Sequence, residues 1–197
     1  MAIELKYIPW STPLEAEELD ALIPGYITTQ AQLNEWEMAN IVDGMQWART
    51  SREDIFTEQF CRKLHKKMFG KTWKWAWEFR KSDKNIGCPW SRIGLELRDT
   101  LDTAKYWTEN KTFSPAEIAI RFHHRLVSVH PFPNGNGRFS RGVADILILR
   151  TKEKPLRWNS FGNLTDVGEV RSKYIASLKK ADIGDYNDLI ALCSPKL

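Results

Sequence analysis

Residues 130–141 read HPFPNGNGRFSR, and they join two segments whose apolar residues recur at helical spacing. The two prolines disfavour continuation of the first helix beyond His130, because proline lacks an N–H group and restricts the residue before it. Two glycines around Asn136 then supply backbone without side chains, from which the second helix begins. A tight corner between helices explains the prolines and glycines. It does not explain the histidine or the two arginines, Arg138 and Arg141.

Helical spacing extends over most of the chain. Phe122, Leu126 and Val129 share one face of the segment before His130, which opens with a capping box at Ser114. Similar periodicity predicts further helices at 32–48, 57–70, 93–104, from 137 onward, 167–180 and 185–193.

Two segments depart from this pattern of long helices. Thr12 and Glu15 form a capping box with Pro13 at the first helical position, which predicts a short helix ending near Pro24. Residues 75–90, WAWEFRKSDKNIGCPW, break the helical period and suit a small β-hairpin. We therefore expect an all-α helical bundle with one small hairpin. An N-terminal helical segment, 1–50, packs on a core formed by 51–197.

Composition sets bounds on the class of protein. The 197 residues are long enough for one domain, and a formal charge of +4 is too small to indicate nucleic-acid binding. The three cysteines are far apart and predict neither a disulfide framework nor a zinc site. Residues 1–10 lack the pattern of a signal peptide, and no run approaches the about 20 apolar residues of a membrane span. We expect a soluble, cytoplasmic protein.

The 130–141 stretch has the parts of a phosphate site. The first turn of a helix has unpaired N–H groups and a partial positive charge, and glycines let an anion approach them. Arg138 and Arg141 lie on one helix face and can bind the same polyphosphate. His130 at the rim can take a proton from a hydroxyl at neutral pH. Together they indicate transfer of a phosphorus-containing group to a hydroxyl, rather than an incidental histidine at a corner.

The same stretch resembles the active-site motif of Fic-domain proteins, H-x-F-x-(D/E)-G-N-G-R-x-x-R, and differs at one defined position. Residues 69–87, FGKTWKWAWEFRKSDKNIG, are similar to the segment that leads into the family's flap hairpin. Residues 174–190, YIASLKKADIGDYNDLI, are similar to the end of many Fic domains. Residues 11–24 and 32–41 resemble a bacterial subgroup of the family labelled mobile mystery protein B.

The resemblance implies a helical protein that transfers AMP from ATP to a Ser, Thr or Tyr hydroxyl of a target protein, with Mg²⁺. It gives catalytic roles to His130 as general base, to Arg138 and to Asn136. It implies that Phe132 anchors the loop in the core. The predicted nucleotide-binding residues are Phe132, Gly135, Asn136, Gly137, Arg138 and Arg141.

The departure from the motif is Asn134, where the family usually has an acidic Mg²⁺ ligand. An amide oxygen can bind Mg²⁺ but lacks the charge that hard cations prefer. Three interpretations follow: a weaker metal site in an active enzyme, a different nucleotide donor, or an inactive relative. We favour the first, with Asn134 as metal ligand, because His130 and both arginines are present.

Other residues have simpler interpretations. Many Fic proteins are inhibited by a glutamate in an (S/T)-x-x-x-E-(G/N) helix, but Glu15 and Glu169 do not complete that pattern, so we expect no such inhibition within the chain. His65 is predicted on an exposed face, and one of His123 and His124 beneath the loop. Trp77, where many relatives have glycine, is predicted to pack under the hairpin.

Two further functions remain as alternatives. A Fic-fold kinase or a transferase of another nucleotide would use the same phosphate site. Relatives that act as kinases, however, lack the second glycine and the second arginine of the motif, which are Gly137 and Arg141 here. A nucleotide-binding regulatory module without turnover is the second alternative. The expected partners are ATP and a target protein along the Arg80–Gly87 hairpin, with no membrane or nucleic acid. The sequence leaves open a separate antitoxin and an oligomer.

Overall fold

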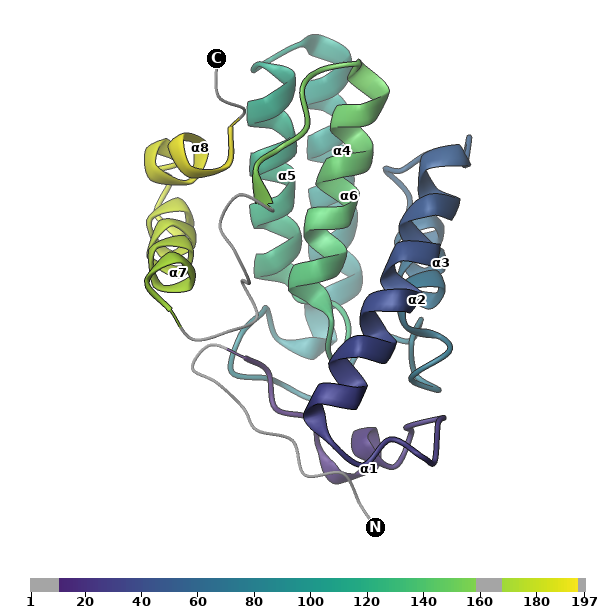
Figure 1. Cartoon of the computed structure of the whole chain (residues 1–197). Helices are drawn as coiled ribbons and strands as arrows, with labels where there is room; N and C mark the ends of the chain where they lie inside the picture. Colours follow the sequence, from purple (N-terminus) through teal and green to yellow (C-terminus); the bar gives the residue numbers. More distant parts are fainter. Residues whose placement is uncertain (1–10, 159–167, 195–197) are drawn as a thin grey trace.

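The computed structural model describes residues 11–158 and 168–194. The interpretation of residues 1–10 as lacking a signal peptide, and the pairing of Thr165 with Glu169, fall outside the described residues. Eight α-helices and one 3₁₀ helix make up the regular structure of the described part (Figure 1). They are α1 (Ala16–Leu19), α2 (Gln30–Thr50), α3 (Glu58–Phe69), η1 (Trp90–Arg92), α4 (Ile93–Asn110), α5 (Pro115–Val129), α6 (Asn136–Thr151), α7 (Glu169–Asp182) and α8 (Asn187–Cys193).

Helices α4, α5 and α6 lie side by side at the centre of the molecule (Figure 1). Helices α2 and α3 flank them on one side, and α7 and α8 on the other. The buried face of α5 includes Phe122 and Leu126, and that of α6 includes Phe139 and Val143. The predicted all-α class is therefore confirmed, and the corner between α5 and α6 lies at the lower end of these central helices (Figure 1).

The helix starts follow local capping chemistry. The side chains of Thr29, Thr57 and Ser114 accept a backbone N–H from the first turn of α2, α3 and α5 respectively. Pro115 occupies the first position of α5, where a missing N–H costs nothing.

The capping box predicted at Thr12 is wrong. Helix α1 begins four residues later, and Glu15 with Glu18 forms its capping box. Thr12 is therefore not used for capping, and its side chain faces the candidate active site.

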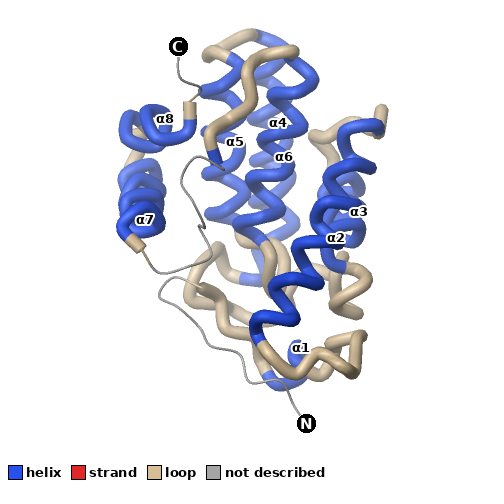
Figure 2. The backbone as a smooth tube through the Cα atoms, viewed as in Figure 1, coloured by secondary structure: helices blue, strands red, loops and turns tan. Residues whose placement is uncertain are grey.

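The predicted β-hairpin is also wrong. Residues 75–89 form turns and bends, and Figure 2 shows no strand among the described residues. The reason lies with Arg80, whose buried guanidinium donates to the carbonyls of Ser82, Cys88, Val129 and His130. Its backbone N–H donates to the Pro131 carbonyl. The segment thus bonds to the α5–α6 corner instead of to a partner strand.

Every helix in the described ranges is too short or too polar to cross a membrane.

Candidate active site

Two residues in the left-handed backbone region shape the corner between α5 and α6. His130 ends α5 with φ 52° and ψ 59°, and Gly135 precedes α6 with φ 78°. A Cβ on Gly135 would lie 2.6 Å from the ring of Phe69, so the glycine is required by space as well as by backbone angle. Loop 130–137 is thus packed against α3.

The side chain of Asn136 closes the loop from inside. Its Nδ2 donates to the Phe132 carbonyl at 2.7 Å, and its Oδ1 accepts from the Phe132 N–H at 2.9 Å. Asn136 is buried, and Phe132 is fully buried among aromatic rings. These contacts fix the loop. The predicted contact of Asn136 with a phosphate stays a prediction.

His65 is buried under the loop, so its predicted exposure is wrong. Its ring stacks on Phe132 with centroids 3.7 Å apart, and its two nitrogens face the carbonyls of Ala76 and Asn134 at 2.8 and 3.1 Å. Burial lowers the pKa of His65 to about 4, so the ring is neutral and can donate to only one of the two carbonyls. The prediction relied on the lysines that follow His65 in the sequence. Adjacent residues of a helix point about 100° apart, so exposed lysines do not imply an exposed histidine.

Two further interpretations concern His123 and Trp77. His123 is buried and pairs with the Tyr174 hydroxyl of α7 at 2.7 Å, and its predicted place beneath the loop stays a prediction. Trp77 is 45% exposed and lies near Lys66 instead of packing inside.

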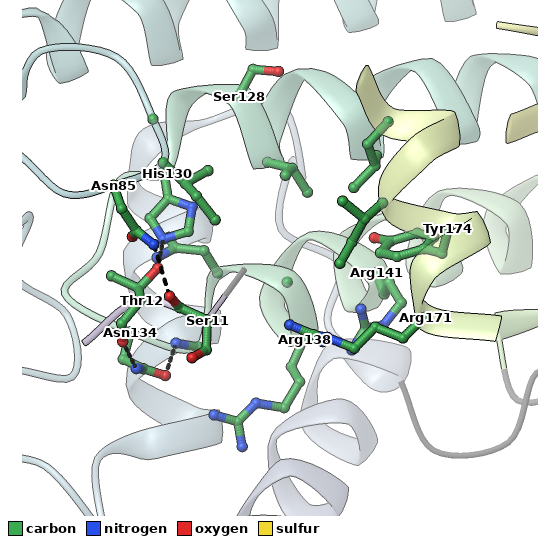
Figure 3. A pocket seen from close by; sticks show the side chains of 18 of the residues that line it. Ser11, Thr12, Asn85, Ser128, His130, Asn134, Arg138, Arg141, Arg171 and Tyr174 are labelled. Carbon is green, nitrogen blue, oxygen red and sulfur yellow. Dashed lines mark hydrogen bonds between the residues drawn. The ribbon is translucent and has the colours of Figure 1, made fainter. Parts of the chain in front are cut away.

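A cavity of about 740 Å³ opens over the loop and the start of α6. Figure 3 shows His130, Thr12 and Asn134 on one side of it and three arginines on the other. The loop lines the cavity with Asn134, Gly135, Asn136 and Gly137, and α6 adds Arg138 and Arg141. The structure thus brings together the predicted site residues, except for Phe132, which lies in the core.

Positive charge gathers on the α6–α7 side of the cavity. Arg171 of α7 lies near Arg141, and burial together with the charge of Arg141 lowers the pKa of Arg171. Arg138 has a different partner, since its Nη1 donates to Glu37 of α2 at 2.5 Å. Glu37 is buried and also accepts from Trp73. Any anion that uses Arg138 competes with this carboxylate.

His130 is covered by residues 11–15, which we call the N-terminal strap. The Thr12 Oγ1 lies 2.9 Å from the His130 Nε2, and both residues are buried, each with 6% of its surface exposed. The pKa of His130 is lowered to about 4, first by burial and then by the positive charges of Arg80 and Lys84. The imidazole is therefore neutral at neutral pH, the form in which it can accept a proton.

The 80–87 segment packs directly on His130. The Arg80 Nε donates to the His130 carbonyl at 2.7 Å, which holds the left-handed backbone at this residue. Gly87 has φ 113°, and a Cβ there would lie 2.6 Å from the His130 Cβ. The segment thus borders His130 directly, and its predicted role in docking a target protein stays a prediction.

Asn134 does not have the surroundings of a metal ligand. Its Oδ1 accepts from the Gly135 N–H at 2.6 Å, and its Nδ2 donates to the Thr12 carbonyl at 3.1 Å. The described residues contain no group of three or more His, Cys, Asp or Glu side chains arranged to hold a metal. The residues present therefore do not form a Mg²⁺ site on their own. A role of Asn134 toward metal bound with phosphates stays a prediction.

Sequence reasoning missed Thr12, Glu37 and Arg171. The burial of Glu37 could be expected from the sequence, because it follows the buried Leu33 by one helical turn and shares its face. The place of Arg171 could not, since only the docking of α7 brings it to the cavity. Thr12 was interpreted as a helix cap, which is a more common role of threonine.

Comparison with known families connects the chain to a described family. The family model described as "Fic/DOC family" matches residues 55–148. The protein adenylyltransferase fic-1 of Caenorhabditis elegans is 33% identical over 98 residues, which are 48% of this chain and 17% of that protein. The chain thus spans about a sixth of the length of this relative.

Solved structures share the fold. A Fic domain of a putative cell filamentation protein from Bartonella quintana aligns with a TM-score of 0.67 at 18% identity, over 88% of this chain and 89% of that chain. The BepC protein of Bartonella tribocorum, solved with bound AMPPNP, aligns with a TM-score of 0.64 at 18% identity, over 93% of this chain and all of that chain. These matches concern the family, and the resemblance to the mobile mystery protein B subgroup stays a prediction.

Proposed function

We propose that this chain, which contains a Fic/DOC domain over residues 55–148, transfers AMP from ATP to a Ser, Thr or Tyr hydroxyl of a protein. The observation that carries the proposal is the position of His130. A neutral imidazole nitrogen lies within hydrogen-bonding distance of a hydroxyl, at the edge of a cavity that the start of α6 lines.

In this proposal His130 removes the proton of the attacking hydroxyl. The hydroxyl oxygen attacks the α-phosphorus, and pyrophosphate leaves. Because the pKa of His130 is well below neutrality, the ring needs no prior deprotonation at pH 7.

The nucleotide's phosphates lie over the start of α6. The first-turn N–H groups around Gly137 have no partner within the helix and attract anions. Arg141 and Arg171 face the same cavity and supply positive charge for the outer phosphates. The N–H of Gly135 is bonded to Asn134 in this structure, so its use requires that Asn134 move.

The target protein lies along the 80–87 segment. This segment already binds a piece of extended chain, since the Asn85 Nδ2 donates to the Ser11 carbonyl at 2.9 Å. A target backbone in the same place presents its hydroxyl to His130.

Two labelled nucleotides distinguish this proposal from the alternatives. The protein is incubated with a cell lysate and ATP labelled at either the α- or the γ-phosphate, with Mg²⁺, beside His130→Ala. Label from the α-phosphate that is lost in His130→Ala supports AMP transfer. Label from the γ-phosphate alone indicates a kinase, and bound ATP without any label indicates a regulatory module.

The role of Arg138 is tested through Glu37. Glu37→Gln removes the charge that competes for Arg138 and keeps an acceptor for the Trp73 N–H. We expect ATP to bind about 3- to 10-fold more tightly, which corresponds to about 1 kcal/mol. Calorimetry measures this change, and the exposed Glu35→Gln on the same helix is the control. Unchanged affinity would mean that Arg138 does not contact the nucleotide.

A further inference from the structure

The N-terminal strap holds a hydroxyl where the proposed reaction needs one. Thr12 comes from outside the motif, 118 residues from His130 in sequence, yet its Oγ1 contacts the His130 Nε2. Thr12 also lines the cavity together with Gly135, Gly137 and Arg141. Its side chain therefore has the base on one side and the predicted phosphate site on the other (Figure 3).

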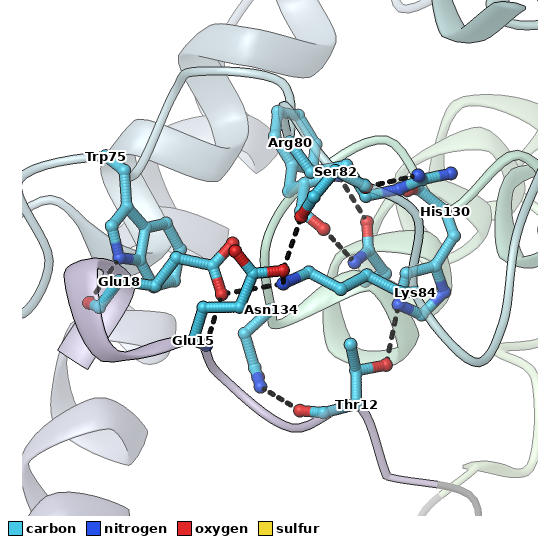
Figure 4. A network of polar contacts seen from close by, with 11 residues as sticks. Thr12, Glu15, Glu18, Trp75, Arg80, Ser82, Lys84, His130 and Asn134 are labelled. Atoms are coloured by element: carbon cyan, nitrogen blue, oxygen red, sulfur yellow. Dashed lines mark hydrogen bonds and ion pairs between the residues drawn. The ribbon is translucent and has the colours of Figure 1, made fainter. Parts of the chain in front are cut away.

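The strap forms hydrogen bonds before, at and after Thr12, and these bonds hold the Thr12 side chain beside His130. Before it, the Ser11 carbonyl accepts from Asn85. At Thr12 itself, the backbone carbonyl accepts from Asn134. After it, the Glu15 carboxylate accepts from Ser82 at 2.5 Å and from Lys84 at 2.9 Å (Figure 4).

Lys84 strengthens the last of these contacts. Its side chain is only 4% exposed, and its Nζ also pairs with Glu18 at 2.8 Å. Glu18 of α1 thus holds the ammonium beside Glu15, although the contact itself is weak because the Glu15 carboxylate is 53% exposed. The strap is thus seated as an extended peptide along the 80–87 segment, the surface assigned above to the target.

We propose that Thr12 is a modification site of this chain, an acceptor hydroxyl that receives AMP from ATP within the same molecule. This inference rests on the proposed function. The Thr12 O–H proton passes to the His130 Nε2, and the Oγ1 forms a bond to the α-phosphorus. The bond from that phosphorus to the oxygen bridging to the β-phosphate breaks, and pyrophosphate leaves. No oxidant or further reactant is needed.

Nearby hydroxyls are less suited to this role. The Tyr174 hydroxyl lies across the cavity and is bonded to His123. Ser140 is buried and donates to the Gly137 carbonyl. Thr12 combines a contact to the His130 Nε2, a place on the cavity wall and anchored backbone on both sides.

The test uses the full chain without lysate. The protein is incubated with ATP and Mg²⁺, and peptide mass spectrometry locates adenylyl groups. We expect one group on the peptide that contains Thr12, with a rate constant that does not change on dilution, because the reaction is intramolecular. Thr12→Val should remove this label, while Thr12→Ser should retain it. Thr28→Val, which changes an exposed threonine outside the site, is the matched control and should retain it.

A lysate arm separates failure of this inference from failure of the proposed function. Labelled lysate proteins with an unmodified Thr12 would overturn the inference and leave the proposed function intact. A labelling rate at Thr12 that rises with protein concentration would overturn the intramolecular route. Absence of label from Thr12 and from every lysate protein would overturn both.

Discussion

Loop 130–137 and the N-terminal strap meet at the same histidine, but they are held by different kinds of contact. Buried groups hold the loop: Asn136 bonds both backbone groups of Phe132, and Arg80 bonds the His130 carbonyl. The strap depends on side chains that reach solvent, with the Glu15 carboxylate 53% exposed. The difference indicates a rigid loop covered by a segment that opens more easily, because local opening follows the least buried contacts.

The largest effect is expected where the loop is held. Arg80→Met removes a buried donor from the carbonyls of Ser82, Cys88, Val129 and His130, of which Val129 keeps only a weak bond from the Cys88 thiol. We expect unfolding free energy to fall by about 3 kcal/mol. Urea unfolding measures this, with Lys81→Met as control, since the Lys81 side chain is 83% exposed. Equal stability of the two variants would show that Arg80 does not hold the loop.

The same contrast explains what the sequence could predict. The helices, the corner and its motif follow from local patterns, because prolines, glycines and caps act on adjacent backbone. The hairpin prediction was wrong because Arg80 bonds to the carbonyls of Val129 and His130, which are about 50 residues away in the sequence and could not be identified from local patterns. Thr12 was assigned to a cap for the same reason, as its contact with His130 depends on tertiary structure. The family resemblance supplied the role of His130, and no pattern near residue 12 supplied the hydroxyl.

The next effect, ranked by the contribution of a single side chain, is the pH dependence of the unfolding free energy. Burial lowers the pKa of both His130 and His65 to about 4, below the ordinary value in the unfolded chain. The unfolded chain therefore binds protons first as pH falls, and stability decreases through the range between the two values. From about pH 7 to about pH 5 we expect a loss of about 2 kcal/mol for each ring. Urea unfolding at both pH values checks this.

His130→Gln measures how much of the pH dependence of stability comes from the His130 ring. The variant should lose only the part of the pH dependence that belongs to His130 and retain the parts from His65, His123 and His124, whose pKa values burial also lowers. An unchanged pH dependence would mean that His130 is solvated in the folded protein, and hence that the strap does not cover it.

A smaller effect is expected from Asn134→Asp, which acts on the strap alone. A carboxylate still accepts from the Gly135 N–H but cannot donate to the Thr12 carbonyl, and the two oxygens repel. We expect the backbone amides of Thr12, Leu14 and Glu15 to exchange about tenfold faster with deuterium, which corresponds to about 1.4 kcal/mol. Loop amides should be unaffected.

The same variant tests the predicted metal role. If Asn134 contributes to Mg²⁺ binding with nucleotide, the added charge should tighten it. Faster exchange without a change in Mg²⁺ affinity would mean that this position serves the strap and not the metal.

The smallest effect is expected at the exposed end of the strap. Hydrogen bonds from Ser82 and Lys84 lower the pKa of Glu15, so its contribution is present above the ordinary glutamate pKa and is lost as pH falls through the lowered value. Glu15→Gln should weaken strap binding by about 0.5 kcal/mol, or about twofold in exchange rate, and less at high salt. Glu17→Gln on the same helix is the control. A tenfold increase in the exchange rate of the strap amides in Glu15→Gln would mean that the ion pair with Lys84 is the main contact that holds the strap. The contrast between a buried loop and a lightly held strap would then be wrong.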